Sequence, residues 1–164
     1  MRSLARLFIA CALATTACGG AASPPPALAP ATPAPARSPV VSWDLLAQEP
    51  VANEARVKHI LIGWKDLADA FRGNLDPRAE ARTQADAEDT VREILAALDA
   101  GADFDATMLE RSEDLSSARS GAPIVVTPDA GLVIEFRMMS LRLEPGQLGV
   151  CQSDFGFHII KRVD

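Results

Sequence analysis

The chain has 164 residues and a formal net charge of −6, from 16 basic and 22 acidic side chains. This length allows one domain of ordinary size in addition to an N-terminal segment. The acidic balance argues against nucleic acid, or an anionic membrane surface, as the main partner, because both attract basic proteins.

The first 17 residues have the pattern of a secretory signal peptide. A short basic start is followed by an apolar run at 7–17, which is too short to span a bilayer. Ala17 and Cys18 then resemble the lipobox of bacterial lipoproteins, although Thr15 stands where such proteins usually carry leucine. We therefore predict a signal peptide over 1–17 and lipidation of Cys18, with ordinary cleavage nearby as the alternative.

An alanine- and proline-rich segment follows at 21–39. Such a composition cannot bury enough apolar surface to fold, and its prolines favour an extended, semi-stiff spacer. We interpret 18–55 as a linker with an N-terminal arm, whose Trp43 packs on a folded domain at 56–164. Behind a lipid anchor, the spacer would hold this domain away from a membrane.

The folded part opens with a strand at 56–63, in which Val57, His59 and Leu61 share one face. The polar stretch that follows, at 64–82, shows no sustained period and is predicted to be a long loop. Loops of this length in a compact domain are usually functional or disordered.

The clearest helix begins at Thr83, which forms a capping-box-like pattern with Asp86, and ends at Gly101. Asp103 is expected to cap a second, shorter helix that runs to about Arg111. The remaining predicted elements are a loop at 112–120, a short strand at 122–127, helical character at 128–140, a turn at 144–147 and a final strand. This order predicts an α+β domain with a small sheet.

Each of the two histidines of the chain lies in an apolar run. His59 occupies the first strand, and His158 lies between Phe155 and Lys161 in the final strand, where both faces look buried. A buried histidine needs a hydrogen-bond partner, because an unpaired polar group is costly in an apolar interior. Taken singly, each histidine is more simply a satisfied core residue than a catalytic one.

Several other chemistries find little support in the sequence. Neither histidine has a second ligand at close spacing, so no metal is expected. The Gly-x-Ser-x-Gly elbow of many serine hydrolases is absent. Since Cys11 is expected to leave with the signal peptide and Cys18 to be acylated, Cys151 is left without a disulfide partner and is interpreted as a small residue at a strand edge.

Considered together, the histidine strands point to a family. The runs Val57-Lys58-His59-Ile60-Leu61-Ile62 and Phe155-Gly156-Phe157-His158-Ile159-Ile160-Lys161 resemble the first and last strands of the parvulin family of peptidyl-prolyl cis/trans isomerases. Between them, further motifs occur in the family's order: Gly101-Ala102-Asp103-Phe104, Glu113-Asp114-Leu115-Ser116-Ser117-Ala118-Arg119-Ser120-Gly121 and Leu143-Glu144-Pro145-Gly146-Gln147. The resemblance covers about 56–163 and implies a parvulin-like domain, with an antiparallel sheet of about four strands flanked by helices.

The resemblance also implies roles for individual residues. His59 and His158 correspond to the paired histidines at the centre of the family's sheet. Asp114 matches a position that is Cys or Asp in parvulins, and Ser153 matches a hydroxyl position just upstream of the second histidine. These four residues would form a catalytic polar network. The implied pocket for the proline ring of the substrate consists of Ile124, Leu132 and Phe136.

The function that the resemblance implies is rotation of X-Pro bonds in exported proteins, which assists their folding. No bond is broken in this reaction and no net proton transfer is needed, so no cofactor is expected. The implied partners are proline-containing unfolded or nascent exported polypeptides, and nucleic acid is not among them. The implied location is the cell envelope or periplasm, with a lipid anchor in a membrane.

One run departs from the family. The family's Gly-Gly-Asp-Leu-Gly-Trp pattern appears as Gly121-Ala122-Pro123-Ile124-Val125-Val126, without the second and third glycines, the Asp and the aromatic residue. Glycine permits unusual backbone angles and close approach, so the alternative is a catalytically weak or inactive module that acts as a chaperone or binding domain. The basic residues of 64–82 alternate with acidic ones, and we interpret this loop as a solvated mixed-charge loop rather than a reader of phosphate before proline, as in one branch of the family.

Overall fold

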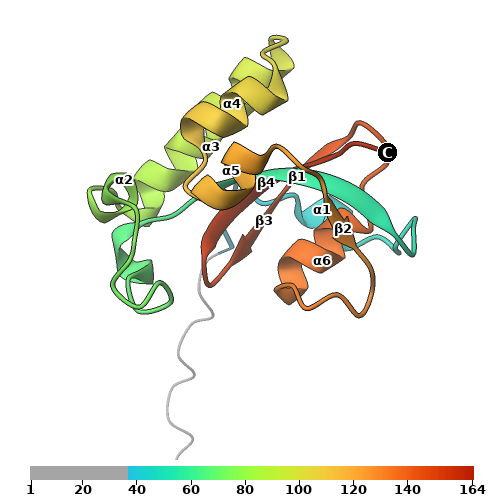
Figure 1. Ribbon diagram of the computed structural model, residues 1–164, viewed down its shortest axis with the longest axis horizontal. Helices are drawn as coiled ribbons and strands as arrows, with labels where there is room; N and C mark the ends of the chain where they lie inside the picture. The colour runs from blue at the N-terminus through green and yellow to red at the C-terminus, as the bar shows by residue number, and fades with distance from the viewer. Residues whose placement is uncertain (1–36) are drawn as a thin grey trace, which may run out of the picture. The chain divides into compact units, whose positions relative to one another are not determined.

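The computed structural model describes residues 37–164 (Figure 1). The predicted signal peptide, Cys18 and most of the proline-rich linker lie outside the described residues. The elements are, in chain order, α1 (Trp43–Leu46), β1 (Ala55–Ile62), a 3₁₀ turn η1 (Lys65–Leu67), α2 (Pro77–Glu80), α3 (Gln84–Asp99), α4 (Phe104–Arg111), α5 (Leu115–Ser120), β2 (Ile124–Val126), α6 (Ile134–Ser140), β3 (Leu148–Ser153) and β4 (Gly156–Arg162). None of the helices in this range has the length and apolar character that a membrane crossing requires.

Within residues 37–164, the strands form one four-stranded antiparallel sheet in the order β2-β1-β4-β3 (Figure 1). The first and last strands of the domain, β1 and β4, are therefore neighbours at the centre of the sheet. Their register pairs His59 with Ile160 and Leu61 with His158. Because side chains alternate along a strand, this register places both histidines on the same face of the sheet.

Helices cover both faces of the sheet. Helix α6 packs on the face that carries the histidines, where Phe136 joins a core cluster with Ile160. The opposite face carries Ile60 and Phe157, which pack with Val91 and other residues of α3 and α4. This arrangement confirms the predicted α+β class and the four-stranded antiparallel sheet.

Two helix starts that the sequence predicted are confirmed. The Thr83 hydroxyl accepts the backbone N–H of Asp86 at 3.3 Å, and the Asp86 carboxylate accepts the backbone N–H of Thr83 at 2.8 Å. The carboxylate of Asp103 caps α4 by accepting the N–H of Ala106 at 2.8 Å. Between these helices, Gly101 turns the chain with a φ of 95°, in the region that favours glycine.

Two segments that were predicted to be loops contain helices. The segment 112–120 contains α5. Asp114 caps the first turn of this helix, and Gly121 ends the helix in the left-handed conformation. The segment 64–82 contains η1 and α2, and Asp76 caps α2, which begins with a proline. Helices of four to six residues are too short to show a hydrophobic period, so the sequence pattern did not reveal them.

The N-terminal arm covers the outer edge of β3. Ser42 donates its backbone N–H to the carbonyl of Val150 at 2.9 Å, and its hydroxyl accepts the N–H of Val150 at 3.0 Å. Leu46 of α1 also packs against the hydrophobic core. Free hydrogen-bonding groups on a sheet edge invite pairing with other chains, so the arm protects this part of the edge.

Candidate active site

The two histidines lie side by side on the central strands. Their Nδ1 atoms are 3.3 Å apart, and their rings stack with centroids 5.4 Å apart. Both residues are buried. They are diagonal neighbours in the register, since His59 is opposite Ile160 and His158 is opposite Leu61. The adjacency of the histidines that we predicted from the sequence is confirmed.

Asp114 contacts one end of the histidine pair. As the N-cap of α5, it accepts the backbone N–H of Ser117 at 3.1 Å and the Ser117 hydroxyl at 2.5 Å. The oxygen that binds this hydroxyl also lies 3.0 Å from His59 Nε2. The residue before it, Glu113, is fixed to β1 because its N–H donates to the carbonyl of Leu61. The hydrogen bond from His59, followed by those from Ser117, holds the pKa of Asp114 well below its usual range, so the carboxyl is ionised.

Ser153 contacts the other end of the pair. It ends β3 and pairs with Gly156 across the hairpin to β4. Its Oγ lies 2.8 Å from His158 Nε2 and accepts the backbone N–H of Phe155 at 3.1 Å. Because that N–H is directed at the hydroxyl oxygen, the hydroxyl hydrogen is available for His158.

The protons of this network can be assigned from the carboxylate end. An ionised Asp114 only accepts, so His59 Nε2 donates to it, and in the tautomer of His59 with a single ring proton the Nδ1 accepts. His158 Nδ1 then donates to His59, and His158 Nε2 accepts the hydroxyl of Ser153. Burial, and next the neighbouring His59, lowers the pKa of His158 to about 3, so this ring is neutral at pH 7. Every hydrogen-bond donor in the series from Ser153 through His158 and His59 therefore points towards Asp114.

An apolar hollow of about 330 Å³ opens over the histidines. Phe136 stands edge-on to both rings, with its centroid 5.1 Å from that of His59 and 5.4 Å from that of His158. Ile124 of β2 and Leu132, which precedes α6, also line the hollow. An apolar concavity with a few convergent polar groups is the usual form of a ligand site.

The run that departs from the family pattern keeps a regular local structure. Gly121 has a φ of 63°, and Ile124–Val126 pairs with β1 as β2. Ala122 replaces a glycine without a positive φ, since Arg72 is the one non-glycine residue with a positive φ among residues 37–164. Val125, at the position of the third glycine, is exposed. The missing glycines therefore leave no backbone strain in this run.

Six of the seven residues predicted for the site line this hollow, namely His59, Asp114, Ile124, Leu132, Phe136 and His158. The seventh, Ser153, does not line it and contacts His158 instead. Sequence reasoning missed Ser117, Gly131 and Val133, which also line the hollow. For Ser117 a signal exists, because an aspartate three residues earlier predicts an N-cap that binds the N–H of Ser117. No sequence signal marks Gly131 or Val133.

The loop at 64–82 uses two of its basic residues for internal contacts. Arg78 binds the carboxylate of Asp76 at 3.0 Å and the carbonyl of Ser112 at 2.9 Å. Arg82 Nη1 lies 2.7 Å from Glu113 Oε1, and both side chains are largely buried. These contacts fix the segment before Asp114. The charges of the loop are mixed, as expected, but Arg82 is largely buried rather than solvated.

The described residues offer little for metal or thiol chemistry. Residues 37–164 contain no group of three or more His, Cys, Asp or Glu residues that could hold a metal ion. Cys151 is a free, buried cysteine, and desolvation raises the pKa of its thiol far above the usual range. A thiol in such surroundings is inert, so Cys151 contributes to packing beneath the site.

The chain resembles known proteins in sequence. The sequence model of the PPIC-type PPIASE domain matches residues 44–164. Foldase protein PrsA of Geobacillus kaustophilus is 31% identical over 127 residues, which cover 76% of this chain and 43% of the relative. Periplasmic chaperone PpiD of Escherichia coli K12 is 38% identical over 82 residues, which cover 49% of this chain and 13% of the relative. The chain spans less than half the length of these two curated relatives.

Solved structures show the same fold. The peptidyl-prolyl isomerase ESS1 from Candida albicans superposes with a TM-score of 0.57 and 18% identity, over 68% of this chain and 63% of that chain. The solution structure of TbPIN1 superposes with a TM-score of 0.57 and 21% identity, over 70% of this chain and 100% of that chain. At these identities the likeness establishes the architecture.

Proposed function

The chain belongs to the PPIC-type peptidyl-prolyl isomerase family, and from this premise we propose that it catalyses the cis/trans isomerisation of X-Pro peptide bonds. The observation that carries the proposal is the hydrogen-bonded series from Ser153 through His158 and His59 to Asp114, beside an apolar hollow. Isomerisation needs a grip on the proline ring and a polar environment that favours the twisted amide.

The hollow supplies the grip on the ring. Rotation about the bond meets a barrier of about 18–20 kcal/mol, and no covalent bond is broken. Phe136, Leu132 and Ile124 present apolar surface to the ring, and Phe136 is held edge-on by both histidines. With the ring held, the carbonyl side of the bond turns.

The polar series favours the twisted amide. In a planar amide, resonance places negative charge on the carbonyl oxygen and double-bond character on the C–N bond. The ionised Asp114 beside the hollow opposes that charge, and therefore disfavours the planar form more than the twisted one. The hydrogen bond from His59, which is itself in contact with His158, fixes the direction of the carboxylate. The reaction transfers no electron or group, so these side chains suffice without a cofactor.

The N-terminal sequence suggests where the enzyme works. We propose that a lipid on Cys18, behind a signal peptide at 1–17, anchors the protein in a membrane of the cell envelope. The substrates are then proline-containing unfolded or nascent exported polypeptides, in keeping with the names foldase and periplasmic chaperone given to two relatives. The mass of the mature N-terminus, and the membrane fraction of a Cys18→Ala variant, test the anchor. A variant that fractionates like the wild type contradicts it.

An isomerisation assay without a coupling protease tests the activity. The mature full-length chain should accelerate the isomerisation of an Ala-Pro tetrapeptide, and a His59→Ala, His158→Ala double variant should lose most of that rate. Unfolding curves of both proteins show whether the variant is folded. A wild-type rate no faster than that of a folded double variant rules the proposal out.

A chaperone without turnover is the second candidate, and the observation that favours it is the replaced run at 121–126. It predicts that the chain suppresses aggregation of an unfolded client equally well with and without the two histidines. Loss of suppression together with loss of isomerisation favours the enzyme.

A further inference from the structure

The two outer edges of the sheet differ in how they are covered. At the β3 edge, the N-terminal arm binds both backbone groups of Val150 through Ser42. The other edge is β2, which pairs with β1 on one side and has no strand on its other side among residues 37–164 (Figure 1). Unpaired backbone groups on a sheet edge are a template for another extended chain. The sheet can therefore accept a further strand beside β2.

The hydrogen bonds of β1 show in which direction the backbone groups of β2 point. Arg56 accepts the backbone N–H of Val163 at 2.8 Å, so the backbone groups of Arg56 point towards the β4 side. Because these groups alternate in direction along an antiparallel strand, those of Val57 point towards β2, where they meet Ile124. Val125 lies opposite Arg56, so its N–H and C=O point away from β1, and no turn or loop of residues 37–164 binds them. Val125 thus presents one donor and one acceptor at the open edge.

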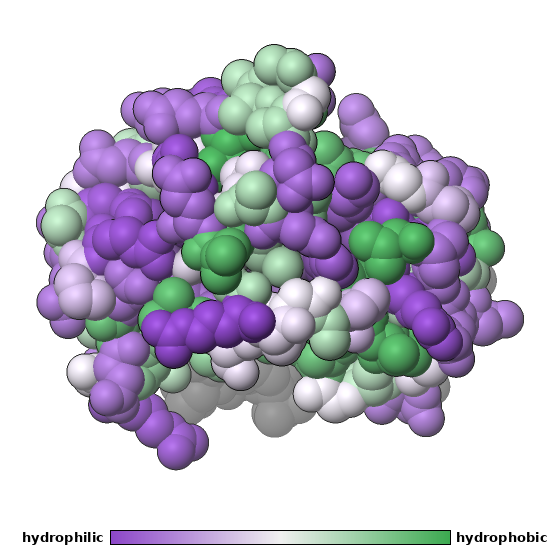
Figure 2. Space-filling model, turned by 45° about the horizontal axis from the view of Figure 1, so that its top comes forward, coloured by the Kyte–Doolittle hydropathy of each residue, from purple (hydrophilic) through white to green (hydrophobic). Residues whose placement is uncertain are grey.

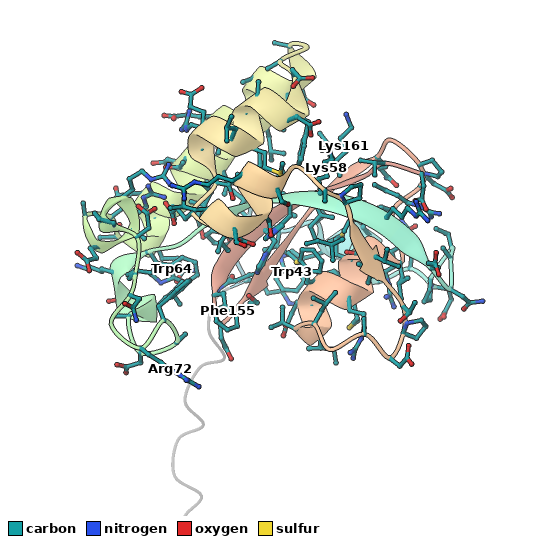
Figure 3. The ribbon with its side chains drawn as sticks, in the orientation of Figure 1. Trp43, Lys58, Trp64, Arg72, Phe155 and Lys161 are labelled. Carbon is teal, nitrogen blue, oxygen red and sulfur yellow. The ribbon has the colours of Figure 1, made fainter. Side chains whose placement is uncertain are left out.

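The alternation of side chains relates this edge to the proline hollow. Ile124 lines the hollow, whereas Val125 lies on the other face of the sheet with Arg56 and is 51% exposed. Lys58 and Lys161 lie side by side on that other face (Figure 3). On a strand added beside β2, the residue opposite Ile124 would project onto the side of the hollow. One extended peptide can therefore pair with Val125 and also enter the hollow.

The surroundings of Val125 suit one short added segment. Pro123 has no N–H to donate, and β2 ends at Val126. A short edge strand with a proline discourages open-ended pairing between identical chains. On the face drawn in Figure 2, apolar side chains occur in separate areas among polar ones, so that face presents no broad apolar patch to an unfolded chain. These features favour recognition through backbone groups.

We propose that β2 binds an extended segment of the client polypeptide as an added antiparallel strand, through the N–H and C=O of Val125. This inference rests on the proposed isomerase function. An antiparallel client passes Val126, then Val125 and then Ile124, which lines the hollow. The paired segment therefore lies on the N-terminal side of the proline. Main-chain pairing provides affinity without reading the client's side chains, which suits a protein that acts on many unfolded chains.

Peptide length tests the pairing on the mature full-length protein. The Ala-Pro tetrapeptide is extended by several valine and threonine residues, on its N-terminal side in one peptide and on its C-terminal side in another. N-terminal extension should raise kcat/KM about tenfold, because two hydrogen bonds to Val125 are added. N-methylation of one residue of the extension should reduce this gain, and N-methylation of its two neighbours should not. No gain from N-terminal extension, or an equal or larger gain from C-terminal extension, overturns the proposal.

Substitutions of Val125 separate the role of its backbone from that of its side chain. Val125→Pro removes the outward N–H, which makes no bond to β1, and should abolish most of the gain from N-terminal extension. Val125→Ala keeps this N–H and is the matched control, in which the gain should persist. The gain is the ratio of the rates on the extended and unextended peptides, and unfolding curves show that each variant is folded. A gain that survives in the proline variant, or is lost equally in the alanine variant, contradicts the assignment.

Amide hydrogen exchange at Val125 tests the pairing without a variant and without activity. The Val125 N–H of the free protein should exchange quickly, and a saturating N-terminally extended peptide should slow its exchange at least about tenfold. If the tetrapeptide is not accelerated at all, the isomerase proposal fails, and this protection still decides whether β2 binds an extended chain. Exchange that the peptide leaves unchanged overturns the proposal. Exchange in the free protein that slows with rising protein concentration also overturns it, because the occupant would then be a second copy of the chain.

Discussion

The Nδ1 atoms of His59 and His158 lie 3.3 Å apart, so a single proton joins the two rings. With that proton on His158, its other ring nitrogen accepts the hydroxyl of Ser153. Protonating His158 would therefore remove the acceptor for Ser153 and place a charge in the core. The depth of burial, and next the neighbouring His59, account for the strong resistance of His158 to protonation.

We predict that acid destabilises the protein through His158. Its pKa is about 6.5 when unfolded and about 3 when folded, so between these values the unfolded state binds more protons. The contribution of His158 to the free energy of unfolding is therefore present above pH 6.5 and is lost as the pH falls towards 3. The slope reaches about 1.4 kcal/mol per pH unit. Urea unfolding of the wild type and of His158→Gln between pH 4 and 7 measures it. Equal slopes in the two proteins contradict the prediction.

Asp114 caps helix α5 and also places a negative charge beside the hollow. Substitutions of Asp114 separate these two roles. Asn is as good an N-cap as Asp and keeps an acceptor for His59, but it carries no charge. We predict that Asp114→Asn changes the free energy of unfolding by less than about 1 kcal/mol and lowers kcat/KM about a hundredfold. Asp114→Ala should also lose about 1 kcal/mol of stability, because α5 loses its cap. Wild-type activity in the Asn variant would show that the charge has no part in the reaction.

The two strands that carry the histidines could be predicted because local patterns mark them. His59 and His158 each lie in an apolar run that predicts a strand. Because side chains alternate along a strand, each run also determines which residues share a face with its histidine. Their pairing then followed from the family resemblance and was confirmed by the register. Helix α5 was missed because Ala118 is its one buried residue, so no hydrophobic period exists. Its signals are the caps at Asp114 and Gly121.

The packing of the loop at 64–82 depends on contacts that no local pattern encodes. Phe71 and Phe155 are far apart in the sequence and meet only after the loop at 64–82 has packed beside the β3–β4 hairpin. The same holds for Arg82 and Glu113, whose opposite charges are equally compatible with solvated side chains. Burial decides between these alternatives, and burial follows from the whole fold.

Gly156, in the β3–β4 hairpin, has no room for a side chain. Its φ is 129°, and a Cβ there would lie 2.5 Å from the carbonyl oxygen of Ile62. We predict that Gly156→Ala lowers the free energy of unfolding by about 3 kcal/mol or more, since strain and a backbone clash add. Because Gly156 pairs with Ser153, the variant should also weaken the contact of Ser153 with His158 and reduce activity.

Gly146→Ala is the control for that prediction. Gly146 also has a positive φ, of 81°, but no atom lies within 4 Å of a Cβ placed there. Its substitution should cost only the conformational term of about 1–2 kcal/mol and leave kcat/KM unchanged. Thermal or urea unfolding of both variants gives the comparison. Equal losses would mean that the close approach to Ile62 has no energetic effect.

The buried pair of Arg82 and Glu113 supports the segment that carries Asp114. Removing one partner leaves the other charge unpaired in the interior, so Arg82→Met should destabilise the protein by about 3–5 kcal/mol. Replacing both, as Arg82→Met with Glu113→Leu, should recover most of that loss, because an apolar pair needs no compensation. Recovery should fall short by about 1 kcal/mol, since Glu113 also accepts the N–H of Gly63. The control is Arg92→Ala, which breaks the pairs of the exposed Arg92 with Asp89 and Glu88 and should cost at most about 1 kcal/mol. Urea unfolding of the four proteins decides the matter: an Arg82→Met loss no larger than that of Arg92→Ala would show that the buried pair does not hold this segment.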